Sequence, residues 1–142
     1  MILDHEGSGQ ERLAPVDVAA ELKHRLAASG WGDRAEVLII VPELEAWVWS
    51  DSTHVDRTLG WGGRTPRLRD WLAARGYWPA DRQKPPRPKE SFQAALMEAK
   101  IRLSSAIFRE LAERVSLKGC EDQSFQQFCE LMRAWFAAGE QT

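Results

Sequence analysis

Two pairs of carboxylates each follow a stretch that we predict to be a β-strand. Glu43 and Glu45 come after the predicted strand 35–41, and Asp4 and Glu6 come after the first three residues. Carboxylate oxygens are the ligands that Mg²⁺ prefers, and one or two of them commonly hold the ion together with substrate phosphates. While the chain remains extended, residues two apart point to the same side, so Asp4 and Glu6 are expected to project together. The alternative is that this Asp-x-Glu-Gly stretch only makes a turn.

The elements around these acids are a strand, a helix and a second strand. Residues 37–41 form an unbroken apolar run within the predicted strand, which is typical of a parallel strand buried on both faces. Residues 13–29 carry apolar side chains at helical spacing, with Pro15 in the first turn and Gly30 after the end. A crossover of this kind is right-handed and brings the carboxyl ends of its two strands to one edge of the sheet. Open α/β sheets bind ligands at that edge.

The crossover is therefore expected to bring Asp4, Glu6, Glu43 and Glu45 together. Like charges held close repel one another, and a cation removes that conflict. The sequence accordingly predicts that these four acids bind Mg²⁺ or Mn²⁺. Glu43 and Glu45 also have a purely structural explanation. A helix that begins at Pro42 would place both glutamates near its N-terminus, where the helix dipole favours negative charge.

Positive charge is concentrated in the middle of the chain. The formal net charge is −2, but residues 62–89 carry 8 Lys/Arg against 2 Asp/Glu, whereas residues 1–61 carry 5 against 11. The prolines between residues 77 and 89 predict an extended basic loop that could follow a phosphate backbone. A spacer or a solvated surface loop is the alternative. The side chains predicted to bind nucleic acid are Arg64, Arg67, Arg69, Arg82, Lys84, Arg87 and Lys89.

The remaining pattern predicts a helical C-terminal half. Apolar residues at helical spacing favour short helices at 51–60 and 65–76, and longer ones at 88–103, 104–117 and 122–136. These last helices lack the basic face of a helix-turn-helix protein. The sequence also lacks the motif of a phosphate-binding loop, the glycine fingerprint of dinucleotide-binding proteins, and a serine or cysteine in a recognisable nucleophile motif.

Length and composition favour a single domain in the cytoplasm. We divide residues 1–142 into a strand and helix core at 1–60, the basic segment at 61–89 and a helical part at 90–142. Neither a membrane span nor a secretory signal is indicated. We expect most of the seven tryptophans to lie in the core, with Leu44, Trp47 and Val48 forming one buried stripe, and the two cysteines, Cys120 and Cys129, to be reduced thiols.

The strand ends resemble a known family. The resemblance lies in Leu3-Asp4-His5-Glu6-Gly7 and in Pro42-Glu43-Leu44-Glu45-Ala46-Trp47, both within residues 1–60. These segments look like the uncharacterised TOPRIM-like family of small bacterial proteins found near defence and mobile-element loci. The wider relatives of that family are topoisomerase–primase domains and overcoming-lysogenization-defect nucleases. The resemblance implies an α/β fold with a small, parallel, Rossmann-like sheet followed by helices.

The resemblance also implies a site and an activity. Asp4 and Glu6 match the Asp-x-Asp pair that binds magnesium in TOPRIM proteins, with a glutamate in place of the second aspartate. The family's first-strand glutamate has no counterpart, and the sheet is expected to be incomplete on its N-terminal side. Either the chain is a fragment or a late start of a longer protein, or Glu6-Gly7 belongs to the first-strand motif instead, or activity is absent. The implied activity is Mg²⁺-dependent cleavage of phosphodiester bonds, with Asp4 and Glu6 as catalytic residues. The alternative is a non-catalytic subunit or oligomerisation module, with a homodimer or a partner protein covering the incomplete sheet.

Overall fold

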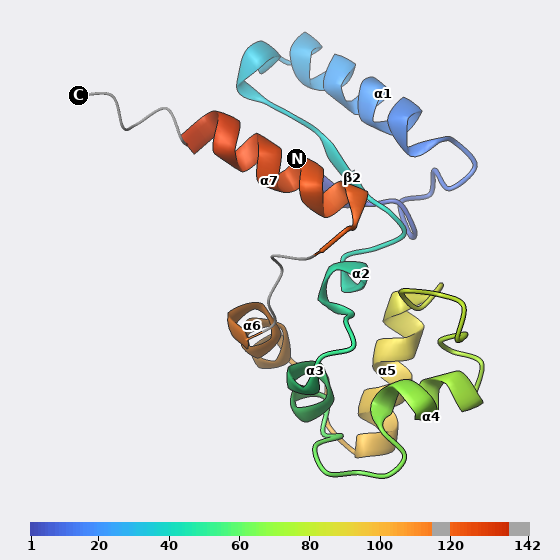
Figure 1. The fold of residues 1–142 in the computed structure, drawn as a ribbon. Coiled ribbons are helices and arrows are strands. Elements are labelled where there is room, and N and C mark those ends of the chain that lie inside the picture. The colour runs from blue at the N-terminus through green and yellow to red at the C-terminus, as the bar shows by residue number, and fades with distance from the viewer. Residues whose placement is uncertain (115–119, 137–142) are drawn as a thin grey trace. The chain divides into compact units, whose positions relative to one another are not determined.

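The computed structural model describes residues 1–114 and 120–136 and has the α/β composition that the sequence predicts (Figure 1). Within these residues the sheet consists of two parallel strands. No helix of this part of the chain is long and apolar enough to cross a membrane. In chain order the elements are β1 (Ile2–Asp4), α1 (Pro15–Ala28), the 3-10 turn η1 (Gly32–Arg34), β2 (Leu38–Ile40), α2 (Glu45–Val48), α3 (Thr53–Thr58), α4 (Leu68–Ala74), α5 (Pro88–Ala99), α6 (Ser105–Arg114) and α7 (Gln123–Phe136).

The chain folds into two compact units. The first unit joins Met1–Leu44 to Cys120–Thr142, and the second unit is Glu45–Gly119. The first therefore contains both strands with α1 and α7, and the second contains α2 to α6. These boundaries differ from those expected near residues 60 and 89, because α7 packs against β2 although the two are distant in sequence. The expectation of a single domain stays a prediction.

The first unit contains the predicted strand–helix–strand crossover. Helix α1 begins at Pro15, as the sequence indicates, and Gly30 follows its end with a left-handed φ of 84°. Both α1 and α7 pack against β2, whose residues are all buried. The ladder is shorter than the predicted strand 35–41 because β1 offers three residues for pairing. Its register pairs Ile2 with Leu38, Leu3 with Ile39 and Asp4 with Ile40.

The helix predicted to begin at Pro42 begins at Glu45 instead. The residues before α2 are bonded to the end of β1. The amide of Glu6 donates to the carbonyl of Pro42 at 2.9 Å, and the amide of Leu44 donates to Oδ1 of Asp4 at 3.0 Å. Because tertiary hydrogen bonds already hold this backbone, it does not form the first helical turn that the proline suggested.

Aromatic and aliphatic side chains form the core of the second unit. Trp49 is 1% exposed, and its ring meets Trp78 and Phe92 edge-on, at centroid distances of 5.3 Å and 6.0 Å. Its Nε1 donates to the carbonyl of Pro88 at 2.9 Å, so the indole N–H is satisfied inside the core. The core comprises Trp49, Val55, Leu59, Trp61, Leu68, Trp71, Leu72, Trp78, Phe92, Ala95, Leu96, Ile107 and Leu111.

The tryptophan prediction is confirmed in its main point. Four of the seven are buried, all in the second unit: Trp49, Trp61, Trp71 and Trp78. Trp31 and Trp135 are 52% and 46% exposed. The predicted buried stripe is wrong at Leu44, which is 43% exposed, while Trp47 and Val48 are half-buried. The stripe fails because it assumed a helix starting at Pro42.

The helices of the C-terminal half begin close to the predicted positions. Helices α5, α6 and α7 start within one residue of 88, 104 and 122. Helix α5 ends at Ala99 rather than at residue 103, because Lys100 adopts a left-handed conformation with φ 57°. Helix α4 is shorter than the predicted 65–76. The predicted end of α6 at residue 117 lies outside the described residues.

Candidate functional site

Backbone hydrogen bonds extend the contact between the strands beyond the sheet. After the β1–β2 ladder ends, the amide of His5 donates to the carbonyl of Ile40 at 2.8 Å, and that of Glu6 donates to Pro42. The carboxylate of Asp4 then accepts the amide of Leu44. The crossover therefore places residues 4–6 beside residues 42–44, at the carboxyl end of the sheet, as the sequence predicts. We call this region the acidic edge.

The chain does not remain extended after Asp4. The predicted directions of the Asp4 and Glu6 side chains assumed that it would. The chain bends at His5 and turns through Glu6 and Gly7, which has a φ of 81°. The amide and hydroxyl of Ser8 both donate to the carbonyl of His5, at 3.3 Å and 2.7 Å, and so close the turn. The expectation that Asp4 and Glu6 project to the same side required an extended chain, and that condition is not met, because this turn begins directly after Asp4. Glu6 lies exposed on the turn.

The four predicted metal ligands fall in two units. Glu43 belongs to the first unit with Asp4 and Glu6, whereas Glu45 begins α2 in the second. Both glutamates are buried, at 7% and 9% exposure. Among residues 1–114 and 120–136, no group of three or more His, Cys, Asp or Glu side chains is arranged to hold a metal ion. Four converging ligands are thus not seen there, and Mg²⁺ binding stays a prediction.

A smaller set of candidate ligands remains for the ion. Magnesium usually keeps several waters and takes only one or two protein carboxylates, with substrate phosphates completing its shell. Asp4 accepts the amide of Leu44 through Oδ1, and no other hydrogen bond to its carboxylate is formed within residues 1–114 and 120–136. Glu6 is exposed on the neighbouring turn. The number of these carboxylates matches what Mg²⁺ usually takes from a protein.

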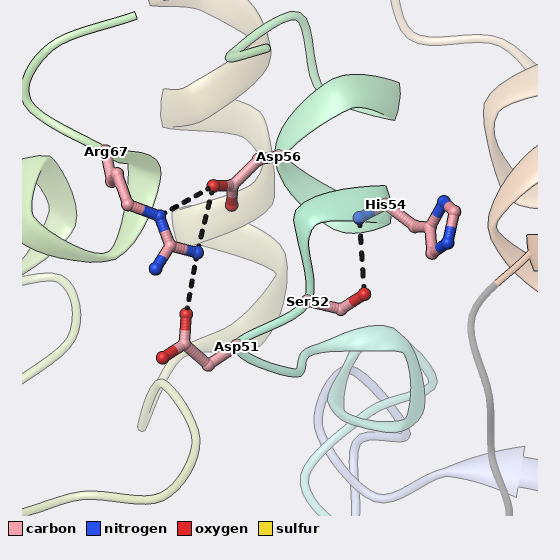
Figure 2. Close-up of polar contacts among 5 residues, drawn as sticks. All are labelled: Asp51, Ser52, His54, Asp56 and Arg67. Carbon is pink, nitrogen blue, oxygen red and sulfur yellow. Dashed lines mark hydrogen bonds and ion pairs between the residues drawn. The ribbon is translucent and has the colours of Figure 1, made fainter. Parts of the chain in front are cut away.

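Arg67, predicted to bind nucleic acid, holds two aspartates of its own unit together. Figure 2 shows its guanidinium between Asp51 and Asp56: Nη2 lies 3.1 Å from Oδ1 of Asp51 and 3.2 Å from Oδ2 of Asp56, and Nε lies 3.3 Å from the same Oδ2. Between these acids the Ser52 hydroxyl accepts the amide of His54 at 3.2 Å and caps α3. Arg67 therefore ties the loop before α4 to the start of α3.

Arg69 and Lys84 also bind backbone carbonyls of the second unit. The guanidinium of Arg69 lies 4.0 Å from the centroid of the Trp78 ring and donates to the carbonyls of Trp78, Pro79 and Arg82 at 3.0–3.3 Å. Lys84 donates to the carbonyl of Ala46. The predicted loop 77–89 thus has no helix before Pro88, as expected, but it is folded around Arg69 rather than extended.

The other predicted nucleic-acid ligands are more exposed. Arg64 lies 5.2 Å from the Trp61 ring centroid, and Arg87 pairs with Glu90 at 2.9 Å on the helical surface. Arg82 and Lys89 are exposed. The basic residues of the segment 62–89 therefore fall into two groups. Arg67, Arg69 and Lys84 bind other parts of the second unit, whereas the remaining ones lie on its surface.

Three buried polar atoms lack hydrogen-bond partners in the described part of the chain, and nothing in the sequence indicated this. Oγ of Ser50, Nδ1 of His54 and Oγ1 of Thr58 have no hydrogen-bond partner within the described residues. His54 and Thr58 are four residues apart on α3, and Figure 2 shows His54 directed away from the Arg67 cluster. An unpaired buried polar atom costs about 1–3 kcal/mol. Only the packing of α3 reveals these atoms.

Comparison with protein-family models, with curated proteins and with solved structures found no match. The fold is therefore described by its α/β composition and its two-stranded parallel sheet, and the TOPRIM-like assignment stays a prediction.

Replacing Asp56 by asparagine is expected to raise the thermal midpoint at pH 7. Burial raises the pKa of Asp56, and the hydrogen bond and charge of Arg67 only partly oppose that shift. A raised folded-state pKa means that the group stabilises the fold below its unfolded pKa, about 3.9, and that this stability is lost as pH rises through the folded value. The midpoint difference between Asp56→Asn and wild type should therefore grow from pH 4 to pH 7.

Calorimetry of both proteins across that range measures the difference. The matched control is Asp81→Asn, whose carboxylate is exposed, and its midpoint should follow the wild type at each pH. A wild type more stable than Asp56→Asn at pH 7 would show instead that the pair with Arg67 outweighs burial.

Proposed function

We propose that this chain is a TOPRIM-like protein of a bacterial defence or mobile-element system that binds Mg²⁺ at the acidic edge and cleaves phosphodiester bonds of nucleic acid. The observation that carries the proposal is the hydrogen bond from the Leu44 amide to Asp4. It fixes the first acid of the Asp-x-Glu pair against the segment that follows β2. The pair thus lies at the carboxyl end of a parallel sheet, where α/β proteins bind ligands.

In this proposal, carboxylates of the first unit bind the metal ion and arginines of the second unit bind the nucleic-acid backbone. A bound Mg²⁺ would supply positive charge that polarises a phosphoryl oxygen and favours hydroxide over water. Asp4 accepts the Leu44 amide through Oδ1 and would bind the ion through Oδ2, and Glu6 would supply a second carboxylate from a solvent-exposed turn. On the second unit, the exposed Arg64 and Arg82 would neutralise backbone phosphates, a term that is independent of base sequence and weakens with salt.

Nicking of supercoiled plasmid by the purified full chain tests this function. We expect cleavage with Mg²⁺ or Mn²⁺, none with EDTA, and at least a tenfold lower rate for the double variant Asp4→Ala, Glu6→Ala. The matched control is Asp17→Ala, Glu21→Ala, which removes two exposed acids of α1 and should cleave within twofold of wild type. Equal rates for the acidic-edge variant and the wild type would refute the assignment.

A second candidate function is a non-catalytic, partner-binding module. It is favoured by the hydrogen bonds of Arg67, Arg69 and Lys84 within the second unit, which reduce the charge available for phosphate contacts. Thermal melts separate the two candidates, because a cation that binds only the folded state raises the midpoint. A midpoint that is unchanged at millimolar Mg²⁺ and Mn²⁺ would favour the module.

A further inference from the structure

Strand β2 has a second edge that faces away from β1. The amide of Leu38 donates to the carbonyl of Met1 at 2.9 Å, and the carbonyl of Ile40 accepts the amide of His5. Leu38 and Ile40 therefore direct their backbone groups toward β1. Because backbone groups alternate along a strand, the N–H and C=O of Ile39 point to the opposite edge.

The outward backbone groups of Ile39 are unpaired in an apolar setting. The described residues contain no third strand beside β2, and no hydrogen bond to the N–H or C=O of Ile39 is formed within them. Ile39 is 7% exposed. More than nine in ten buried backbone groups in proteins are paired, so this edge has the chemistry of a strand that lacks its neighbour.

A groove runs along this edge between two helices of the first unit. Helices α1 and α7 both pack against β2, and Figure 1 shows β2 passing between them. The groove has a volume of about 930 Å³. We call this groove the strand slot. Its walls include Val16 and Ala19 of α1, Ile39 of β2, Val41 just after β2, and Gln127 and Leu131 of α7.

The size of the strand slot matches one β-strand. Neighbouring strands lie about 4.8 Å apart, packed layers about 10 Å apart, and a strand rises about 3.3 Å per residue, so six residues occupy roughly 950 Å³. This agrees with the groove volume of about 930 Å³. The slot therefore has about the volume of an extended segment of six residues.

The lining also indicates the chemistry of the occupant. Carbon-rich side chains of α1 and β2 suit alternating apolar residues. Two carboxylates also line the groove: Glu130 of α7, and Asp122, which precedes α7 and accepts the hydroxyl of Ser124 and the amide of Phe125 through Oδ1. No lysine or arginine lines the groove among the described residues. A segment with a basic residue beside its apolar core would complement these acids. A second copy of this chain fits less well, because its own β2 is flanked by α1 and α7.

We infer that the strand slot binds an extended, apolar, basic-flanked segment of a partner protein, which adds to β2 as a third strand. Its backbone pairs with Ile39, and its alternate side chains contact α1 and α7. This site is independent of Mg²⁺ and of cleavage, and it gives the partner-binding function a location on the chain.

Selection from a phage-displayed library of random heptapeptides on the immobilised full chain tests the site. We expect enrichment of peptides that alternate β-branched or aromatic residues and carry Lys or Arg at an end. Ala19→Trp fills the slot from α1, whereas the neighbouring Ala20→Trp, exposed and outside the lining, is the matched control. A synthetic selected peptide should bind Ala19→Trp at least tenfold more weakly than wild type, and Ala20→Trp within twofold.

Two further measurements keep the test decisive if Ala19→Trp does not fold. Val16→Arg places positive charge at the slot and should weaken the peptide tenfold, while the exposed Leu13→Arg outside it should not. Binding should also slow hydrogen exchange of the Ile39 amide. The inference is overturned if no such peptides are enriched, if Ala19→Trp and wild type bind the selected peptide equally, or if sedimentation shows a wild-type dimer that Ala19→Trp abolishes, which would make the occupant a second copy.

Discussion

Trp49→Ala is expected to lower the free energy of unfolding of the second unit by about 3–5 kcal/mol. The side chain is 1% exposed and packs edge-on against Trp78 and Phe92, so its removal leaves a large cavity among rigid aromatic rings. It also leaves the carbonyl of Pro88 without the indole N–H. Urea denaturation followed by circular dichroism measures the change.

Trp31→Ala provides the matched control for Trp49→Ala. Trp31 is 52% exposed, and Cζ of Arg34 lies 5.4 Å from the centroid of its ring. A cation–π contact at an exposed site contributes about 0.5–1 kcal/mol. We therefore expect a loss of no more than about 1 kcal/mol. Equal losses from the two substitutions would contradict the core described for the second unit.

Gly60→Ala is expected to cost roughly 2–3 kcal/mol of stability, from backbone strain and overpacking together. Gly60 follows α3 with a φ of 78°, a conformation that is unfavourable for residues with a Cβ. An added Cβ would overlap Cδ1 of Ile101 and approach Cβ of Ala99 at 3.0 Å. The end of the isoleucine side chain can move, but the alanine methyl can shift only with its backbone.

Gly63→Ala separates the two sources of this cost. Gly63 has nearly the same φ, 76°, and an added Cβ would meet no atom within 4 Å. Its replacement should cost about 1 kcal/mol, which is the backbone contribution alone. If both variants unfold at the same denaturant concentration, the close packing of Gly60 against the end of α5 is not present in solution.

The sequence predicts the first unit best where local pattern and fold agree. The apolar run 37–41 can be satisfied only by burial, and Pro15 and Gly30 bound α1 through their own backbone preferences. From these elements the handedness of crossovers places Asp4 beside the segment after β2. The hydrogen bond between Asp4 and Leu44 has the location that this reasoning predicts.

Features that depend on tertiary contacts could not be predicted in the same way. The local preference of Pro42 for a helix start is overridden by hydrogen bonds to Asp4 and Glu6. The charge of Arg67 indicates a phosphate ligand until Asp51 and Asp56 are seen to surround it. The strand slot has no sequence signature, because α7 reaches β2 from the far end of the chain.

Paramagnetic broadening by Mn²⁺ tests the central claim, a divalent cation site at the acidic edge, most directly. In nitrogen-15 spectra of the full chain, substoichiometric Mn²⁺ should first broaden the amide signals of residues 4–7 and of Glu43 and Leu44, and excess Mg²⁺ should restore them. The variant Asp4→Asn, Glu6→Gln should require at least tenfold more Mn²⁺ for the same broadening. Broadening centred elsewhere, or unchanged in this variant, would contradict the acidic edge as a cation site.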